Sequence, residues 1–187
     1  MPFTDTGFPG LLIFEPAVYG DQRGYFFESY NEQTFQQHAA FANRFVQDNQ
    51  ARSTYGVVRG LHFQQAPHAQ TKLIRALEGS ILDVVLDLRA GSPTYGKVYS
   101  VELSATNKKQ LLVPRGFAHG YSVLSETAEV FYKCDSLYQK SAEGGVAFDD
   151  PLLAINWQIP ADAMVLSEKD RQYPLFSDCR HNFVFEK

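Results

Sequence analysis

The sequence predicts an all-β protein whose short antiparallel strands form two packed sheets or a barrel. Three observations favour this fold class. Apolar and polar residues alternate along several segments, as they do in strands with one buried face. Turn sequences such as Glu78-Gly79-Ser80 and Ala105-Thr106-Asn107 separate these segments at short intervals. Aromatic residues make up 14% of the chain and are nearly all Phe and Tyr, which pack well on sheets.

The 187 residues are expected to form one domain, because no linker, repeat or low-complexity segment divides them. We expect strands within residues 1–30, a short helix over residues 31–46, and a C-terminal segment, residues 165–187, that packs on the sheets. The helix is predicted from a cap at Asn31 and from residues that recur at helical spacing. Those residues are Phe35, His38, Ala39, Ala42 and Phe45.

Alternation is clearest from Ile81 to Arg89, where Leu82, Val84, Leu86 and Leu88 share one face. Asp83, Asp87 and Arg89 lie on the other face with Ile81 and Val85. Further strands are predicted at Lys97–Leu103, Gln110–Pro114 and Glu126–Cys134. On the last of these, Tyr132 shares its face with Ala128, Val130 and Cys134.

Composition excludes several classes of function. The net charge is −4 and Lys and Arg are not clustered, which argues against a nucleic-acid-binding protein. The two cysteines, Cys134 and Cys179, have no Cys-x-x-Cys spacing and are expected to be reduced thiols. The chain lacks a secretory signal pattern and any apolar run of about 20 residues. We therefore expect a cytoplasmic protein with no membrane partner.

Two histidines stand in segments that carry candidate chemistry. His62 follows Val58-Arg59-Gly60-Leu61, and on a strand it shares a face with Gly60 and Gln64, where a glycine leaves room for a ligand. His119 ends the segment Pro114-Arg115-Gly116-Phe117-Ala118-His119. Taken singly, each histidine is more often structural than catalytic. Together the segments are similar to the two motifs of the cupin superfamily, a double-sheet jelly roll.

The residues around His62 argue against a metal site. Metal-binding cupins usually have His-x-His and a glutamate in the first motif, but here Gln64 follows His62 at that spacing. Lys72 stands in the region where an acidic ligand is expected, and its charge repels a divalent ion. His62 and His119 alone are too few ligands, so we expect no metal and no other cofactor.

A metal-free cavity with these residues suits proton transfer next to a ketone. A neutral histidine is a good base near pH 7, and a lysine stabilises an enolate oxygen. A tyrosine such as Tyr132 can return a proton from the opposite wall. Asp170 can hold the His62 imidazole in one tautomer. These roles together describe epimerisation.

The chain resembles the dTDP-4-dehydrorhamnose 3,5-epimerase family, and the resemblance extends along nearly all of its length. Each segment is weak evidence alone, but six in order at the spacing of the family are specific. They are Asp21-Gln22-Arg23-Gly24-Tyr25-Phe26-Phe27-Glu28, Gln47-Asp48-Asn49, Val58-Arg59-Gly60-Leu61-His62, Pro114-Arg115-Gly116-Phe117-Ala118-His119-Gly120, Tyr132-Lys133 and Ser167-Glu168-Lys169-Asp170.

The resemblance implies a cofactor-independent isomerase of dTDP-L-rhamnose biosynthesis. Its substrate would be dTDP-4-dehydro-6-deoxy-D-glucose and its product dTDP-4-dehydro-L-rhamnose. His62 would remove the protons at C3 and C5 with Asp170 as its partner. Tyr132 would reprotonate the opposite face, and Lys72 would stabilise the enolate oxygen at C4.

The resemblance also implies a substrate-binding set and a homodimer. Tyr138 would stack on thymine, and Arg23 and Glu28 would reach across from a partner subunit, to which residues 1–30 contribute. The implied substrate-binding residues are Arg23, Glu28, Gln47, Asp48, Asn49, Arg59, Lys72, His119, Tyr138, Glu143 and Lys169. His38, His68 and His181 match no family motif and are interpreted as structural or surface residues.

Other functions remain open at this point. A related dTDP-sugar cupin acts at one carbon only, or moves the carbonyl as a 3,4-ketoisomerase. A metal-dependent cupin oxygenase and a non-catalytic sugar-nucleotide-binding cupin are more remote alternatives. The presence of both His62 and Tyr132 favours an enzyme over a binding protein.

Overall fold

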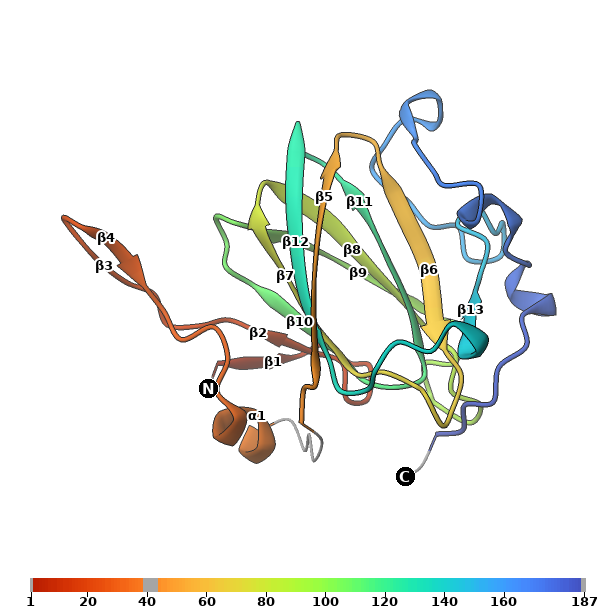
Figure 1. The fold of residues 1–187 in the computed structure, drawn as a ribbon. Helices are drawn as coiled ribbons and strands as arrows, with labels where there is room; N and C mark the ends of the chain where they lie inside the picture. The colour runs from red at the N-terminus through yellow and green to blue at the C-terminus, as the bar shows by residue number, and fades with distance from the viewer. Residues whose placement is uncertain (1, 39–43, 186–187) are drawn as a thin grey trace.

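The computed structural model describes residues 2–38 and 44–185, which fold into two antiparallel sheets packed face to face (Figure 1). The first sheet has six strands, in the order β1 (Phe3–Asp5), β2 (Leu12–Phe14), β10 (Gln110–Val113), β7 (Lys72–Glu78), β12 (Thr127–Cys134) and β5 (Gln47–Thr54). The second has five, in the order β13 (Glu143–Gly145), β6 (Val58–Gln64), β11 (Phe117–Val123), β8 (Ser80–Asp87) and β9 (Val98–Ser104). The predicted two-sheet fold is confirmed.

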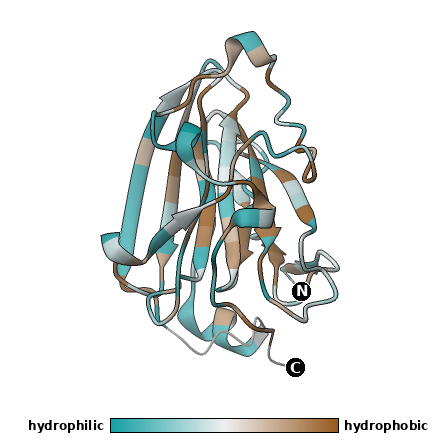
Figure 2. Cartoon of the chain, turned by 90° about the vertical axis from the view of Figure 1, so that its right-hand side faces the viewer, coloured by the Kyte–Doolittle hydropathy of each residue, from teal (hydrophilic) through white to brown (hydrophobic). Residues whose placement is uncertain are grey.

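The predicted strands agree with β8, β9, β10 and β12 to within two residues at each end. Figure 2 shows where apolar residues (brown) and polar residues (teal) lie along the strands of the molecule. On β9, Tyr99, Val101 and Leu103 all face the core between the sheets, as the pattern predicted. At the predicted turn before β8, Gly79 has a φ of +68°, a conformation that side chains rarely adopt.

Strand β8 is buried on both faces, which the sequence pattern did not predict. Ile81 and Val85 pack into the core between the two sheets. Leu82, Val84 and Leu86 pack into a second core, against the segment that follows β13. Because both faces are covered, Asp83 lies fully buried inside the molecule rather than on a polar face.

The helix α1 (Glu32–His38) is shorter than the predicted helix. Its first turn is capped as expected, since the Thr34 amide donates to the Asn31 side chain at 3.3 Å. The predicted extension to residue 46 is wrong at its end, because residues 44–46 are not helical. There Phe45 packs edge-on against Tyr30 from an extended segment that leads into β5. Ala39 and Ala42 lie outside the described residues.

The C-terminal segment crosses the outer face of the five-stranded sheet (blue in Figure 1). Val165 pairs with Val57 just before β6, and Val184 pairs with Ala90 beyond β8. Between them lie the 3-10 helices η3 (Asp170–Gln172) and η4 (Phe176–Asp178); two others, η1 (Lys140–Ala142) and η2 (Ala161–Ala163), precede this segment. The route of the segment brings Asp170 beside His62 on β6.

The hairpin of β3 (Tyr19–Asp21) and β4 (Gly24–Phe26) projects away from the sheets (Figure 1). It exposes large apolar side chains, with Tyr25 62% and Phe26 70% accessible. Monomeric proteins rarely expose such groups together without a binding partner. In the described part of the chain, no helix has the length and apolar character needed to cross a membrane.

The small core beneath α1 supplies a test of the fold. Phe35 is fully buried against Phe14, Leu73 and Leu112. We expect Phe35→Ala to lower the free energy of unfolding by about 3–5 kcal/mol, because it leaves a cavity in a packed core. Urea denaturation measures this loss. Gln36→Ala, on the exposed side of the same helix, is the control and is expected to change stability by less than about 0.5 kcal/mol.

Candidate active site

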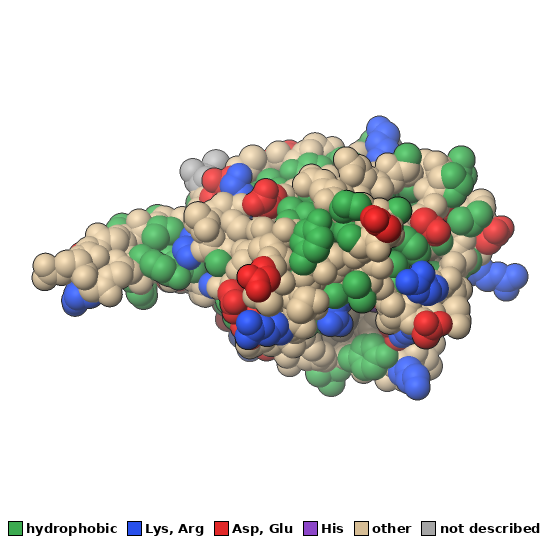
Figure 3. All heavy atoms as spheres, turned by 90° about the horizontal axis from the view of Figure 1, so that it is seen from above, with side chains coloured by type: hydrophobic (Ala, Val, Ile, Leu, Met, Phe, Trp, Pro, Cys, Tyr) green, Lys and Arg blue, Asp and Glu red, His purple; other side chains and the backbone are tan. Residues whose placement is uncertain are grey.

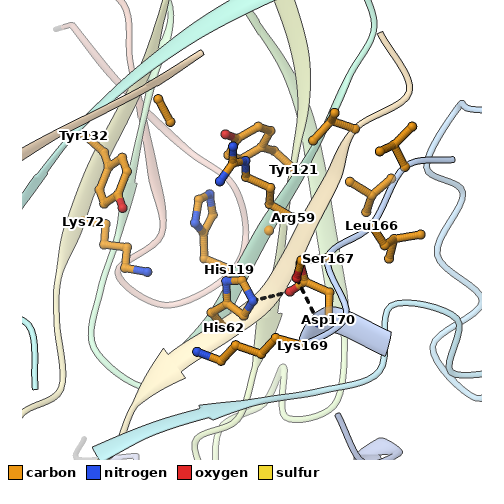
Figure 4. A pocket seen from close by; sticks show the side chains of 15 residues that line it. Arg59, His62, Lys72, His119, Tyr121, Tyr132, Leu166, Ser167, Lys169 and Asp170 are labelled. Atoms are coloured by element: carbon orange, nitrogen blue, oxygen red, sulfur yellow. Dashed lines mark hydrogen bonds and ion pairs between the residues drawn. The ribbon is translucent and has the colours of Figure 1, made fainter. Parts of the chain in front are cut away.

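A cavity of about 470 Å³ opens between the two sheets (Figure 4). Its polar lining includes Arg59, His62, Lys72, His119, Tyr121, Tyr132, Ser167, Lys169 and Asp170. A second cavity of about 360 Å³ shares His62, Lys72 and Tyr132 with the first. The two cavities are therefore adjacent and meet at these three side chains.

The walls of this site come from different sheets. Lys72 stands on β7 and Tyr132 on β12, both in the six-stranded sheet. His62 stands on β6 and His119 on β11, in the five-stranded sheet. Figure 4 shows Tyr132 and Lys72 on one side of the cavity and His62 on the other. A flat ligand held between the sheets would meet the phenol on one face and the imidazole on the other.

The His62 imidazole is held at one edge by Asp170. Its Nε2 lies 2.5 Å from Oδ1 of Asp170, and the Ser167 hydroxyl donates to Oδ2 at 2.6 Å. Burial raises the pKa of Asp170, but the hydrogen bonds from His62 and Ser167 outweigh it, so the net pKa is lowered. An ionised Asp170 favours the tautomer with the proton on Nε2, which leaves Nδ1 free to accept a proton.

Tyr132 and Lys72 form the opposite wall. Burial, helped by the neighbouring Cys134 thiol and Tyr121, raises the pKa of Tyr132 to about 12. The phenol is therefore protonated at neutral pH and available as an acid. Burial lowers the pKa of Lys72, while the charges of Asp83 and Glu143 oppose that shift. The Lys72 Nζ lies 5.9 Å from the centre of the Tyr132 ring.

A second imidazole–carboxylate pair lies deeper in the cavity. His119 Nε2 is 2.9 Å from Oδ2 of the fully buried Asp83. Sequence reasoning missed Asp83, although a carboxylate within the apolar run of β8 was a usable signal. It also missed Ser53, whose hydroxyl accepts from the Arg59 guanidinium at 3.1 Å, and Ser167. Both pairs are local in sequence, since Ser53 lies six residues before Arg59 and Ser167 three residues before Asp170. The Ser-x-x-Asp spacing of the second pair was a usable signal.

Gly60 has a different role from the one predicted. Its φ is +116°, and a Cβ there would lie 2.5 Å from the Cα of Gly120 on β11. The glycine thus allows two backbones to approach, rather than giving space to a ligand. The β6–β11 register shifts here, so that Arg59 and His62, three residues apart, both line the cavity. Simple alternation would place them on opposite faces.

Five predicted substrate-binding residues gather at the outer end of the second cavity and its rim. The Tyr138 hydroxyl donates to Glu143 at 2.8 Å, and Lys169 pairs with the same carboxylate at 2.6 Å. The Gln47 side chain accepts from the Tyr138 amide and donates to Asn49.

Gln64, in the position of the missing metal ligand, donates to the carbonyl of His68 at 2.7 Å and accepts from the Gln139 amide at 2.6 Å.

Three predicted residues are not brought to the cavity. Asp48 lies on the outer face of β5, where it pairs with Lys133 at 2.9 Å. Arg23 pairs with Asp21 in the projecting hairpin, and Glu28 accepts from Asn31. Within residues 2–38 and 44–185, no three His, Cys, Asp or Glu side chains come together as a metal ion would require.

The order and geometry of these groups agree with a known family. A family model described as dTDP-4-dehydrorhamnose 3,5-epimerase matches residues 5–178. The chain belongs to the dTDP-4-dehydrorhamnose 3,5-epimerase family. The family resemblance predicted from the motifs is therefore confirmed.

Individual relatives of the dTDP-4-dehydrorhamnose 3,5-epimerase family agree. The enzyme of that name from Pseudomonas aeruginosa is 48% identical over 178 residues, covering 95% of this chain and 97% of its own. The crystal structure of the enzyme from Elizabethkingia anophelis NUHP1 is 53% identical with a TM-score of 0.91, over 94% of this chain and 96% of its own. A third relative is a dTDP-6-deoxy-D-glucose-3,5-epimerase from Legionella pneumophila, whose crystal structure was solved in complex with dTDP-4-keto-L-rhamnose. It is 42% identical with a TM-score of 0.90, and the match covers 94% of this chain and 93% of that chain.

These similarities confirm the predicted cupin-type jelly roll and the predicted enzyme class, an isomerase of the epimerase type. The similarities also support the main predicted reaction, because these relatives are named dTDP-4-dehydrorhamnose 3,5-epimerase.

The Asp170 carboxylate predicts a pH dependence of stability. Its pKa is lower in the folded state than the value of about 3.9 for an unfolded chain. The stability that it contributes is present above that unfolded value and is lost as the pH falls through the folded value. Between about pH 6 and about pH 3, wild type should therefore lose more unfolding free energy than Asp170→Asn. Urea denaturation at both pH values tests this.

The control for this comparison is Asp162→Asn, at an exposed carboxylate in η2. It should lose as much stability on acidification as wild type does. An equal loss in wild type and Asp170→Asn would show that the Asp170 contacts do not stabilise the ionised form.

Proposed function

We propose that the chain inverts C3 and C5 of dTDP-4-dehydro-6-deoxy-D-glucose by two proton transfers at each carbon. The observation that carries the proposal is the position of His62 and Tyr132 on opposite walls of one cavity. Inversion needs a base on one face of the carbon and an acid on the other. A cytoplasmic location stays a prediction.

The reaction begins with removal of a proton. The C4 ketone acidifies the C–H bonds at C3 and C5, and Nδ1 of His62 takes the proton. Asp170, ionised and fixed by Ser167, stabilises the imidazolium that forms. Lys72 is already in place when negative charge develops on the C4 oxygen, so little reorganisation is needed.

Reprotonation comes from the other wall. Tyr132 donates its phenolic proton to the opposite face of the planar carbon, and the enolate electrons form the new C–H bond. The imidazolium has gained one proton and the phenol has lost one, so exchange with solvent restores both groups. A phenolate whose conjugate acid has a pKa of about 12 regains its proton readily.

Inversion at two carbons requires the sugar to reposition while the nucleotide is held. Tyr138, more than half exposed at the outer end of the site, offers a flat face for stacking on thymine. Lys169, Arg59 and His119 provide positive or hydrogen-bonding groups for the sugar and diphosphate. Gln47, Asn49 and Glu143 complete the proposed binding set in this chain.

We further propose that the enzyme is a homodimer in which the hairpin of one chain reaches the site of its partner. Tyr25 and Phe26 expose apolar rings on the hairpin, which projects from the body of the molecule (Figure 3) and contacts it where Lys108 Nζ lies 4.1 Å from the centre of the Tyr25 ring. Arg23 and Glu28 lie on or beside it and line no cavity with His62. Docking on a second copy would cover the rings and deliver both charges to a nucleotide.

Inversion at a single carbon is the alternative within the same chemistry, because it uses the same base and acid. Incubation with dTDP-4-dehydro-6-deoxy-D-glucose in D₂O, followed by NMR, separates the two. We expect deuterium at both C3 and C5 without added metal and in the presence of a chelator. Deuterium at one carbon only would support the mono-epimerase instead.

Two variants make the same experiment report on mechanism. His62→Ala should abolish exchange at both carbons, because the base is gone. Tyr132→Phe should slow inversion by about 10²- to 10⁴-fold while His62 still exchanges protons on its own face. Tyr99→Phe, a phenol to phenyl change in the core between the sheets, is the matched control.

Mixed dimers test the shared site. In a dimer of one Arg23→Ala chain and one His62→Ala chain, one site has both defects and the other has none. Such mixed dimers, isolated with two affinity tags, should regain about half of wild-type activity, although each parent is impaired. A monomer by light scattering, or a mixed dimer no more active than its parents, would contradict the proposed assembly.

A further inference from the structure

Tyr173 touches the proposed base from a side that the mechanism does not use. Its ring lies edge-on to the His62 imidazole, with centroids 5.4 Å apart and planes at 63°. This T-shaped geometry is favourable for aromatic rings. Tyr173 does not line either cavity that contains His62, so its ring contacts the imidazole without bordering the space for the ligand.

The space for this ring is created by a glycine. Gly145 on β13 is the direct cross-strand neighbour of His62 on β6. A Cβ at Gly145 would lie 2.6 Å from two atoms of the Tyr173 ring. The ring therefore occupies the place where the side chain opposite His62 would normally stand. Residue 145 must remain a glycine for the ring to reach the imidazole.

The backbone on both sides of Tyr173 is fixed. The residue follows the helix η3 in an extended conformation, three positions after Asp170. The carbonyl of the next residue, Pro174, accepts from the Ala147 amide at 2.8 Å. One short segment thus supplies a carboxylate to the Nε2 edge of His62 and an aromatic ring to its side.

We propose that Tyr173 is a positioning residue that fixes the plane of the His62 imidazole for proton abstraction. The inference rests on the proposed function, in which His62 is the base. The contact with Asp170 alone leaves the ring free to rotate about the axis through that hydrogen bond, and the Tyr173 ring removes this freedom. A base that must reach two different carbons gains from a fixed plane, since misplacement of about 1 Å can cost about 10²-fold in rate.

Substitution of the ring tests the proposal. Tyr173→Leu should lower kcat by about 10- to 100-fold while the affinity for dTDP, measured by calorimetry, changes less than about twofold. Tyr173→Phe keeps the ring and should retain kcat within about threefold. Tyr55→Leu, the same change at an exposed tyrosine in the turn between β5 and β6, controls for the substitution itself.

A double variant separates positioning from general support of the fold. If both groups act through the His62 ring, Tyr173→Leu should cost little more in the Asp170→Asn background. The proposal is overturned if Tyr173→Leu keeps kcat within about twofold of wild type, or if its dTDP affinity falls in parallel with kcat. It is also overturned if Tyr173→Phe loses as much kcat as Tyr173→Leu, or if the fold-losses in kcat of Tyr173→Leu and Asp170→Asn multiply in the double variant. Deuterium exchange by the wild-type enzyme is measured in the same series as the reference. If the wild type shows no exchange, the proposed function is refuted, and not the positioning role of Tyr173.

A variant that leaves Tyr173 in place covers the case in which Tyr173→Leu does not fold. Gly145→Ala puts a methyl group where the ring lies and should displace it from His62. It should reproduce the loss of kcat with unchanged dTDP affinity. Full activity in Gly145→Ala would overturn the proposal.

Discussion

The contact between His62 and Asp170 is the interaction on which the rest of the site depends. It joins residues 108 positions apart, one on a strand of the five-stranded sheet and one in the segment that crosses its outer face. The carboxylate is almost fully buried, so it needs the donors that His62 and Ser167 supply. In turn it fixes which imidazole nitrogen faces the cavity. The C-terminal segment is therefore part of the proposed catalytic machinery as well as a cover for the sheet.

The two-sheet architecture explains how the proposed base and acid are kept apart. His62 and Tyr132 belong to different sheets, and each sheet is held by its own ladder of backbone hydrogen bonds. The packed core between the sheets sets the distance between the walls. Opposed proton transfer thus follows from the fold itself, and no moving lid is required to assemble it.

Much of the fold was predictable because strands obey a local rule. Alternation located β8 and β9, and on β12 it put Tyr132 on the same face as Ala128, Val130 and Cys134. It failed where a non-local contact decided the outcome. The register shift at Gly60 depends on the approach of β11, and the burial of Asp83 depends on layers covering both faces of β8. The site was predicted largely by resemblance to the family. Three neighbouring motif residues show that a matching motif does not by itself tell which of its side chains face the cavity. Gln47 and Asn49 reach the cavity, whereas Asp48 between them points to the other face of β5.

Cys134 gives the site a further property. Its thiol borders the second cavity next to Tyr132, and burial, with lesser effects from Asp48 and Asp135, raises its pKa to about 11. Only a thiolate adds readily to a carbonyl. A ketone substrate held close to this sulfur is therefore safe from hemithioketal formation, although a soft nucleophile stands within the binding pocket. The same scarcity of thiolate should make the enzyme slow to inactivate with electrophilic sugar analogues aimed at that cysteine.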